Sequence, residues 1–111
     1  MKSLVVINAS HTLFPEQVAL LGEYERVDIP EAGLDLGGIR ELASTMLKRA
    51  GKEKARIVVA SPIPALFVFL AANGQKFYVF HNDKRDAKEV PDGKGGKKVV
   101  HAVSATGWQL V

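Results

Sequence analysis

A cluster of polar side chains follows the first apolar segment of the chain. Residues 4–7 are all apolar, and the next five residues are Asn8-Ala9-Ser10-His11-Thr12. Ligands of open α/β sheets bind at the carboxyl ends of the strands, which makes this junction a candidate site. Because histidine changes its charge near neutral pH, His11 could act as a general acid or base. It could equally stabilise a turn by hydrogen bonding to the backbone.

Two later junctions have the same character. Ser61-Pro62 follows the apolar residues 57–59, and His81-Asn82 with Lys84-Arg85 follow residues 76–80. Parallel strands would bring all three junctions to one edge of a sheet. Ser61 is expected to cap the next helix or to bind a ligand oxygen, capping being the commoner role of serine there. Arg85 could fork onto a phosphate or pair with Asp83 or Asp86 at the surface.

Several chemistries are excluded or disfavoured by composition and spacing. The chain has no cysteine, so disulfides, thiolate catalysis and cysteine-ligated metals are excluded. It has neither a glycine-rich dinucleotide fingerprint nor a phosphate-loop motif. Ser10 beside His11 lacks the surroundings of a catalytic triad. His11, His81 and His101 match no local metal motif, although a site assembled from all three stays open. We therefore expect neither cofactor nor metal.

Basic residues are concentrated at the end of the chain. Residues 76–111 hold seven Lys or Arg against four acids, whereas in residues 1–75 the charges cancel. Lys94 lies in a glycine-rich stretch of this last third. Such an excess favours an anionic partner such as phosphate or RNA, or else a solvated basic hairpin.

The apolar pattern predicts one α/β domain with an open, mainly parallel sheet. Strands are expected at residues 2–8, 24–29, 56–60 and 76–80, with helices at 15–21, 39–50 and 64–72. Gly22 and Gly51 are expected to end the first two helices. Residues 86–111 are expected to form a β-hairpin, with strands at 87–90 and 97–103, and a terminal strand at 107–111.

The helix at residues 64–72 is apolar on every side, which predicts burial against more than one partner. In so small a domain a second subunit is the simplest cover, and we expect a homodimer. No apolar run is long enough to span a bilayer, and no signal peptide is expected. These features and the absence of cysteine are compatible with a cytoplasmic location.

Two segments resemble small accessory proteins encoded in type III CRISPR loci. Residues 6–17, VINASHTLFPEQ, resemble their opening, in which a first strand ends in Ser-His before a helix. Residues 85–93, RDAKEVPDG, followed by residues 97–101, KKVVH, resemble their C-terminal pattern of an arginine, a turn and a basic strand. Phe14 departs from the family pattern, which has a capping threonine there.

The resemblance implies a Rossmann-like fold with helices on both faces of the sheet and a C-terminal β-hairpin. It also implies a homodimer that binds cyclic oligoadenylate, usually the tetra-adenylate ring, across its two-fold axis. Some relatives are ring nucleases that work without metal: a ribose 2′-OH attacks the adjacent phosphate in line and leaves a 2′,3′-cyclic phosphate. Other relatives only sequester the ring. Neither a membrane nor duplex DNA is an expected partner.

The resemblance also implies roles for the strand-end residues. His11 would position or deprotonate the 2′-OH, and Arg85 would stabilise the phosphate. Ser10 and the following amides would bind phosphate, while Lys84 and Lys94 would supply a positive field or a lid. The remaining expected ligand contacts are Asn8, Ala9, Thr12, Ser61, Pro62, His81 and Asn82. Two alternatives stay open: a non-catalytic sensor or sponge, and a structural subunit that docks through the apolar helix at residues 63–70.

Overall fold

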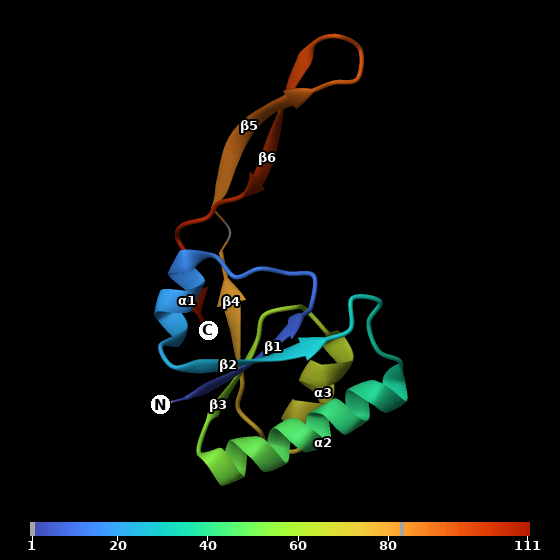
Figure 1. Cartoon of the computed structure of the whole chain (residues 1–111), viewed down its shortest axis with the longest axis vertical. Coiled ribbons are helices and arrows are strands. Elements are labelled where there is room, and N and C mark those ends of the chain that lie inside the picture. The colour runs from blue at the N-terminus through green and yellow to red at the C-terminus, as the bar shows by residue number, and fades with distance from the viewer. Residues whose placement is uncertain (1, 83) are drawn as a thin grey trace.

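A five-stranded sheet forms the centre of the computed structural model, which describes residues 2–82 and 84–111 (Figure 1). Its strand order is β2-β1-β3-β4-β7. Strands β1 (Ser3–Asn8), β2 (Tyr24–Ile29), β3 (Arg56–Val59) and β4 (Tyr78–His81) are parallel to one another, and β7 (Gln109–Leu110) is antiparallel to β4. The expected α/β class with a mainly parallel sheet is confirmed.

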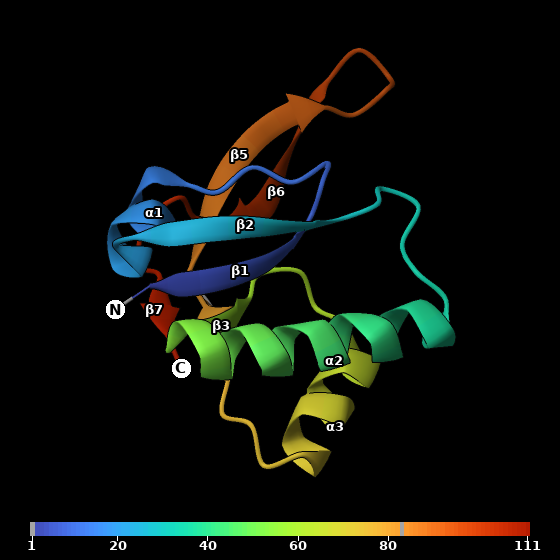
Figure 2. The same ribbon diagram turned by 60° about the horizontal axis from the view of Figure 1, so that its bottom comes forward.

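Two helices pack on one face of this sheet. Helix α2 (Leu36–Glu53) and helix α3 (Pro64–Ala72) lie together on the same side, as Figure 2 shows. Side chains from these helices meet alternate residues of the two central strands, because successive strand residues point to opposite faces. The buried residues of this main core are Leu4, Val6, Ile29, Ile39, Ala43, Met46, Ala50, Ala55, Ile57, Val59, Leu66 and Leu70.

A smaller core lies on the other face, where Leu21 of α1 (Pro15–Leu21) contacts Val5, Ile7 and Val58. The Glu16 carboxylate of α1 accepts hydrogen bonds from the backbone amides of Gly107 (2.8 Å) and Trp108 (2.7 Å). These bonds tie the end of the chain to the first helix and hold β7 at the edge of the sheet.

Strands β5 (Arg85–Pro91) and β6 (Lys97–Val103) form a separate antiparallel pair. Figure 1 shows this hairpin projecting beyond the end of the sheet to which β4 points. Its base is held by Asn82, whose side-chain amide donates to the carbonyls of Ser104 (3.1 Å) and Thr106 (2.9 Å). Most hairpin residues are exposed, so the hairpin contributes little to either core.

The end of α2 differs from the sequence prediction. Gly51 was expected to end this helix, but α2 continues to Glu53 and ends at Lys54, which adopts a left-handed conformation with φ of 50°. The Lys54 amide donates to the Ala50 carbonyl, so the cap is made by a residue other than glycine. Helix α2 also begins earlier than expected, because the Asp35 side chain accepts from the Gly38 amide at 2.8 Å and caps the first turn.

The bounds of α1, β2 and α3 agree with the expected ranges, and Gly22 ends α1 with φ of 64°. In the part of the chain that the structure describes, no helix has both the length and the apolar character needed to cross a membrane.

Candidate functional site

A pocket of about 460 Å³ opens at the carboxyl ends of β1 and β3. Three polar side chains, those of Asn8, His11 and Ser61, lie among a largely apolar lining. The other lining residues are Ile29, Gly33, Leu34, Leu36, Ile39, Pro62, Ile63, Pro64 and Ala65. This combination of an apolar surface and a few convergent polar groups is typical of small-molecule sites.

The polar groups of the pocket are linked through Ser61. Its hydroxyl oxygen accepts a hydrogen bond from the backbone amide of Asn8 at 2.8 Å. It also lies 3.0 Å from Nδ1 of His11, in hydrogen-bonding geometry. Only 6% of Ser61 is exposed, whereas His11 is exposed. The imidazole is thus held at the pocket by a buried hydroxyl that is itself anchored to the backbone of β1.

The expectation that Ser61 caps α3 is wrong. The residue at the N-cap of α3 is Ile63, and no side chain caps this helix. Ser61 instead lies close to β1, its own amide donating to the Val6 carbonyl at 3.4 Å and its hydroxyl accepting from Asn8. The parallel pairing of β1 with β3 brings these positions together.

The loop after β1 is organised by Asn8. Its Oδ1 accepts from the amide (2.9 Å) and the hydroxyl (2.7 Å) of Ser10, and its Nδ2 donates to the Glu31 carbonyl at 3.2 Å.

The backbone of His11 is held from two sides. The His11 amide donates to the Asn8 carbonyl at 2.9 Å. The Arg26 guanidinium donates to the His11 carbonyl at 3.1 Å and pairs with Asp28 at 2.8 Å. The position of His11 is therefore fixed by its neighbours on β1 and β2.

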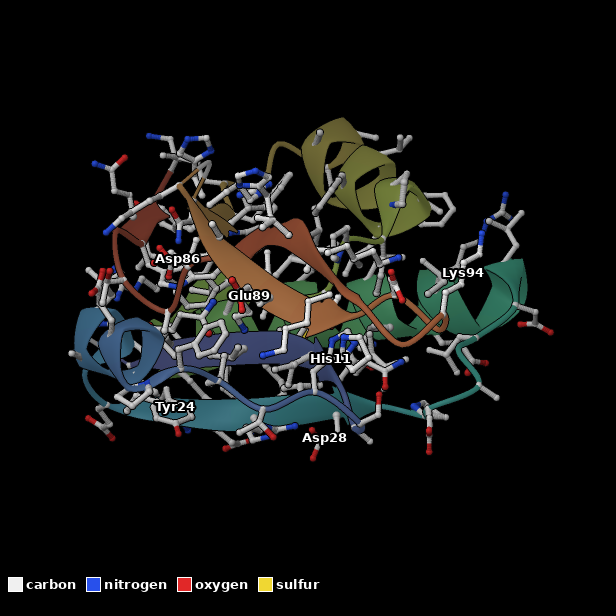
Figure 3. All side chains as sticks on the ribbon, turned by 90° about the horizontal axis from the view of Figure 1, so that it is seen from above. His11, Tyr24, Asp28, Asp86, Glu89 and Lys94 are labelled. Carbon is white, nitrogen blue, oxygen red and sulfur yellow. The ribbon has the colours of Figure 1, made fainter. Side chains whose placement is uncertain are left out.

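The structure brings together four of the expected site residues, namely Asn8, His11, Ser61 and Pro62. Ala9, Ser10 and Thr12 are exposed on the same loop but do not line the pocket. Figure 3 looks down onto this edge of the sheet and shows His11 beneath the hairpin.

A second group of expected residues lies at the end of β4 and on the hairpin, outside the pocket lining. It consists of His81, Asn82, Lys84, Arg85 and Lys94. Arg85 donates through Nη1 to the carbonyls of Asn82 (3.0 Å) and Lys84 (3.1 Å). Lys94 belongs to the exposed hairpin loop. Within one chain, the structure therefore does not place Arg85 or Lys94 at the pocket that contains His11. Asp83, one of the suggested partners of Arg85, lies outside the described residues.

Sequence reasoning missed the pocket wall formed by the end of β2, the loop after it and the first turn of α2. Ile29, Gly33, Leu34, Leu36 and Ile39 all line the pocket. Leu34, in the loop after β2, and Leu36, the first residue of α2, are 39% and 55% exposed. The available signal in the sequence was the presence of two leucines in residues 31–38, a segment otherwise rich in glycine and acidic residues.

The pocket carries little fixed charge. Among the described residues its lining includes no Lys, Arg, Asp or Glu, and His11 is its one titratable side chain. The described residues also include no cluster of three or more His, Asp or Glu side chains that could hold a metal ion. The site assembled from three histidines is therefore not formed within the described part of a single chain.

No family model matches this chain, and searches of curated proteins and of solved structures found no similar protein.

Proposed function

We propose that this protein binds a cyclic oligoadenylate, with the tetra-adenylate ring as the first candidate. The pocket at the ends of β1 and β3 is the observation that carries the proposal. Its apolar lining, which includes Leu34, Leu36 and Ile63, suits the face of an adenine base. The side chains of Asn8, His11 and Ser61 suit the polar sugar and phosphate atoms that follow such a base. The volume of about 460 Å³ lies in the usual range for small-molecule sites.

The charge distribution supports an anionic ligand that extends beyond one pocket. The pocket itself is uncharged apart from His11, whereas Lys84, Arg85 and Lys94 are exposed on or beside the projecting hairpin. A ring of phosphodiesters has several charges and could contact both regions. In a two-fold dimer the hairpin of one subunit would supply Arg85 to a ring held by the pocket of the other. Arg85 is not among the residues that line the pocket of its own chain, which favours this arrangement over one within a single chain.

The proposed reaction is metal-independent ring opening, which would switch off type III CRISPR signalling. A ribose 2′-OH loses its proton and attacks the adjacent phosphorus, the bond to the 5′ oxygen breaks, the departing 5′ oxygen takes up a proton to become a hydroxyl, and a 2′,3′-cyclic phosphate remains. Such a reaction depends on holding the attacking and leaving oxygens in line and on stabilising the charge of the phosphorane. His11 would position or deprotonate the 2′-OH, and Arg85 would stabilise the phosphate.

Calorimetric titration with cyclic tetra-adenylate tests binding. We expect wild-type protein to bind the ring, and Arg85→Ala to weaken binding by about tenfold or more, since hydrogen bonds to charged groups are strong. Lys48→Ala is the matched control, because it removes one positive charge from an exposed position of α2 and should leave the affinity unchanged. Absence of heat with oligoadenylate rings of every size would exclude the proposal.

Sequestration without cleavage is the second candidate. It is favoured by the lack of a carboxylate or lysine among the described pocket-lining residues, because a general base other than His11 is then missing. Incubation of excess protein with the ring in the presence of EDTA separates the two functions. Appearance of the 2′,3′-cyclic phosphate product favours the ring nuclease. A ring that stays intact although tightly bound favours the sponge.

A further inference from the structure

The hydrogen atoms around Ser61 can be assigned from its partners. A serine hydroxyl donates one hydrogen bond and can accept two. The backbone amide of Asn8 can only donate, so at 2.8 Å the Ser61 oxygen must accept from it. The remaining contact, 3.0 Å to Nδ1 of His11, admits two arrangements. Either the Ser61 hydroxyl donates to a bare Nδ1, or a protonated Nδ1 donates to the Ser61 oxygen.

The two arrangements differ in the fate of the Ser61 proton. If Nδ1 were protonated, the Ser61 hydroxyl would need another acceptor, and the described residues provide none. Ser61 is 94% buried, and its hydroxyl would then depend on an acceptor in the pocket that Ser61 also lines, whereas Nδ1 is an acceptor already in place. If the hydroxyl donates to Nδ1, all three groups are satisfied at once. In neutral His11 the single ring proton must then reside on Nε2.

We propose that Ser61 is a positioning residue that fixes neutral His11 as the Nε2–H tautomer, so that His11 offers the ligand a hydrogen-bond donor rather than a base. His11 lines the pocket, and its Nε2 has no hydrogen-bond partner among residues 2–82 and 84–111. The acceptor that fits this donor in an RNA-like ring is a non-bridging phosphate oxygen. That assignment of the ligand atom depends on the proposed function, whereas the tautomer does not.

The tautomer has a consequence for the reaction. A neutral imidazole with a protonated Nε2 cannot take the 2′-OH proton at that nitrogen. His11 then acts by hydrogen bonding to the phosphate, and the proton of the 2′-OH has to leave to solvent. Any ring opening in this pocket is accordingly slow and limited by the absence of a base.

The tautomer is measured without any ligand. In uniformly ¹⁵N-labelled protein at about pH 8, where histidines are ordinarily neutral, a long-range ¹H–¹⁵N spectrum distinguishes the protonated from the bare ring nitrogen. The His11→Gln variant identifies the His11 signals by their loss, and His81 and His101 serve as internal references. We expect Nε2 to be protonated and Nδ1 bare. A protonated Nδ1 in the wild-type protein would overturn the proposal.

Two substitutions test the role of Ser61. Ser61→Ala removes the hydroxyl proton, and we expect His11 to show a mixture of tautomers. Ser61→Thr retains a hydroxyl at the same position, and we expect it to restore the Nε2–H form. If Ser61→Ala does not fold, the wild-type and Ser61→Thr spectra still show which His11 tautomer is present. An unchanged tautomer in a folded Ser61→Ala would show that Ser61 does not determine it.

Binding of the oligoadenylate ring tests whether the Nε2–H group of His11 donates a hydrogen bond to the ligand. The amide nitrogen of glutamine can stand in for Nε2–H but cannot act as a base, so His11→Gln should bind cyclic tetra-adenylate within about threefold of wild type, while His11→Ala should lose about tenfold. Equal losses in the two variants, or retained binding with complete loss of cleavage in both, would overturn the donor role. Absence of binding by wild-type protein would contradict the proposed function. The ¹H–¹⁵N spectrum would then be the remaining test of the tautomer.

Discussion

At the scale of single residues, a network of charged side chains lies at the end of the sheet opposite the pocket. The described pocket lining carries no Lys, Arg, Asp or Glu, whereas four charged side chains meet where β1 and β2 begin. Lys2 pairs with Glu53 (2.8 Å) and Glu25 (3.2 Å), and Arg49 pairs with Glu53 (2.6 Å) and Glu25 (2.7 Å). This network joins the start of the sheet to the last turns of α2.

The network makes stability depend on acid pH. Hydrogen bonding by Arg49, and then by Lys2, lowers the pKa of Glu53 to about 2 and lowers the pKa of Glu25 from its usual value near 4.5. Because these pKa values are lower in the folded state, the carboxylates stabilise it above about pH 4.5, and this stabilisation is lost as the pH falls towards 2.

We expect the free energy of unfolding to decrease between pH 5 and pH 2, and Glu53→Gln to make this decrease shallower. Urea unfolding at a series of pH values measures both. Glu41→Gln, an exposed position of the same helix, should keep the wild-type slope. A slope that is the same in wild type and Glu53→Gln would show that the network does not stabilise the fold.

At the scale of elements, α2 ends at Lys54 and passes through Gly51, which was expected to end it. Gly51 lies inside the last turn, where a glycine is less favourable than alanine. A Cβ built at Gly51 meets no atom within 4 Å, and the backbone there has no positive φ.

Gly51→Ala should therefore stabilise the protein by about 0.5–1 kcal/mol. Urea unfolding monitored by circular dichroism measures the change. Gly22→Ala is the opposite control, since Gly22 has a φ of 64° and alanine is strained there. The stability of the Gly22→Ala variant should be lower than that of wild type, although no atom lies within 4 Å of the added Cβ. Destabilisation by Gly51→Ala would contradict the position of this helix end.

The sequence was sufficient to locate the strand ends but not the contacts made there. Residues 4–7 are apolar without interruption, which is typical of a strand covered on both faces, and the polar residues after it had to lie at its end. The contact of His11 with Ser61 joins positions that are 50 residues apart, and it depends on the pairing of β1 with β3. The hydrophobic pattern does not encode which strands are neighbours. For the same reason the hydrophobic pattern could not predict that Arg85 lies outside the pocket lining.

At the scale of the whole molecule, two exposed features lack a partner within the described chain. The hairpin makes the molecule elongated, with dimensions of 55 × 30 × 21 Å. Isolated two-stranded hairpins are marginally stable in water. Val99 and Val103 of β6 are 59% and 42% exposed, so these apolar side chains of the hairpin are largely uncovered by the described chain.

Helix α3 is the other exposed feature. Leu66 and Leu70 are fully buried against the sheet and α2, while Val68 on the opposite side of the helix is 63% exposed. A helix that is apolar on both sides needs cover on both sides. The fold provides only one of these covers, which keeps the homodimer a prediction for both the ring-binding protein and the alternative structural subunit.

Light scattering of the purified protein at micromolar concentration should give the mass of a dimer. If the dimer forms through α3, Val68→Lys should convert it to a monomer, because an interface that buries a lysine without a partner is strongly disfavoured. Val99→Lys is the matched variant, since it makes the same change at a valine of similar exposure on the hairpin, and it should leave the mass unchanged. Dissociation by Val99→Lys alone would place the interface on the hairpin. A monomer mass for the wild-type chain would exclude the dimer, and with it the supply of Arg85 from a second subunit.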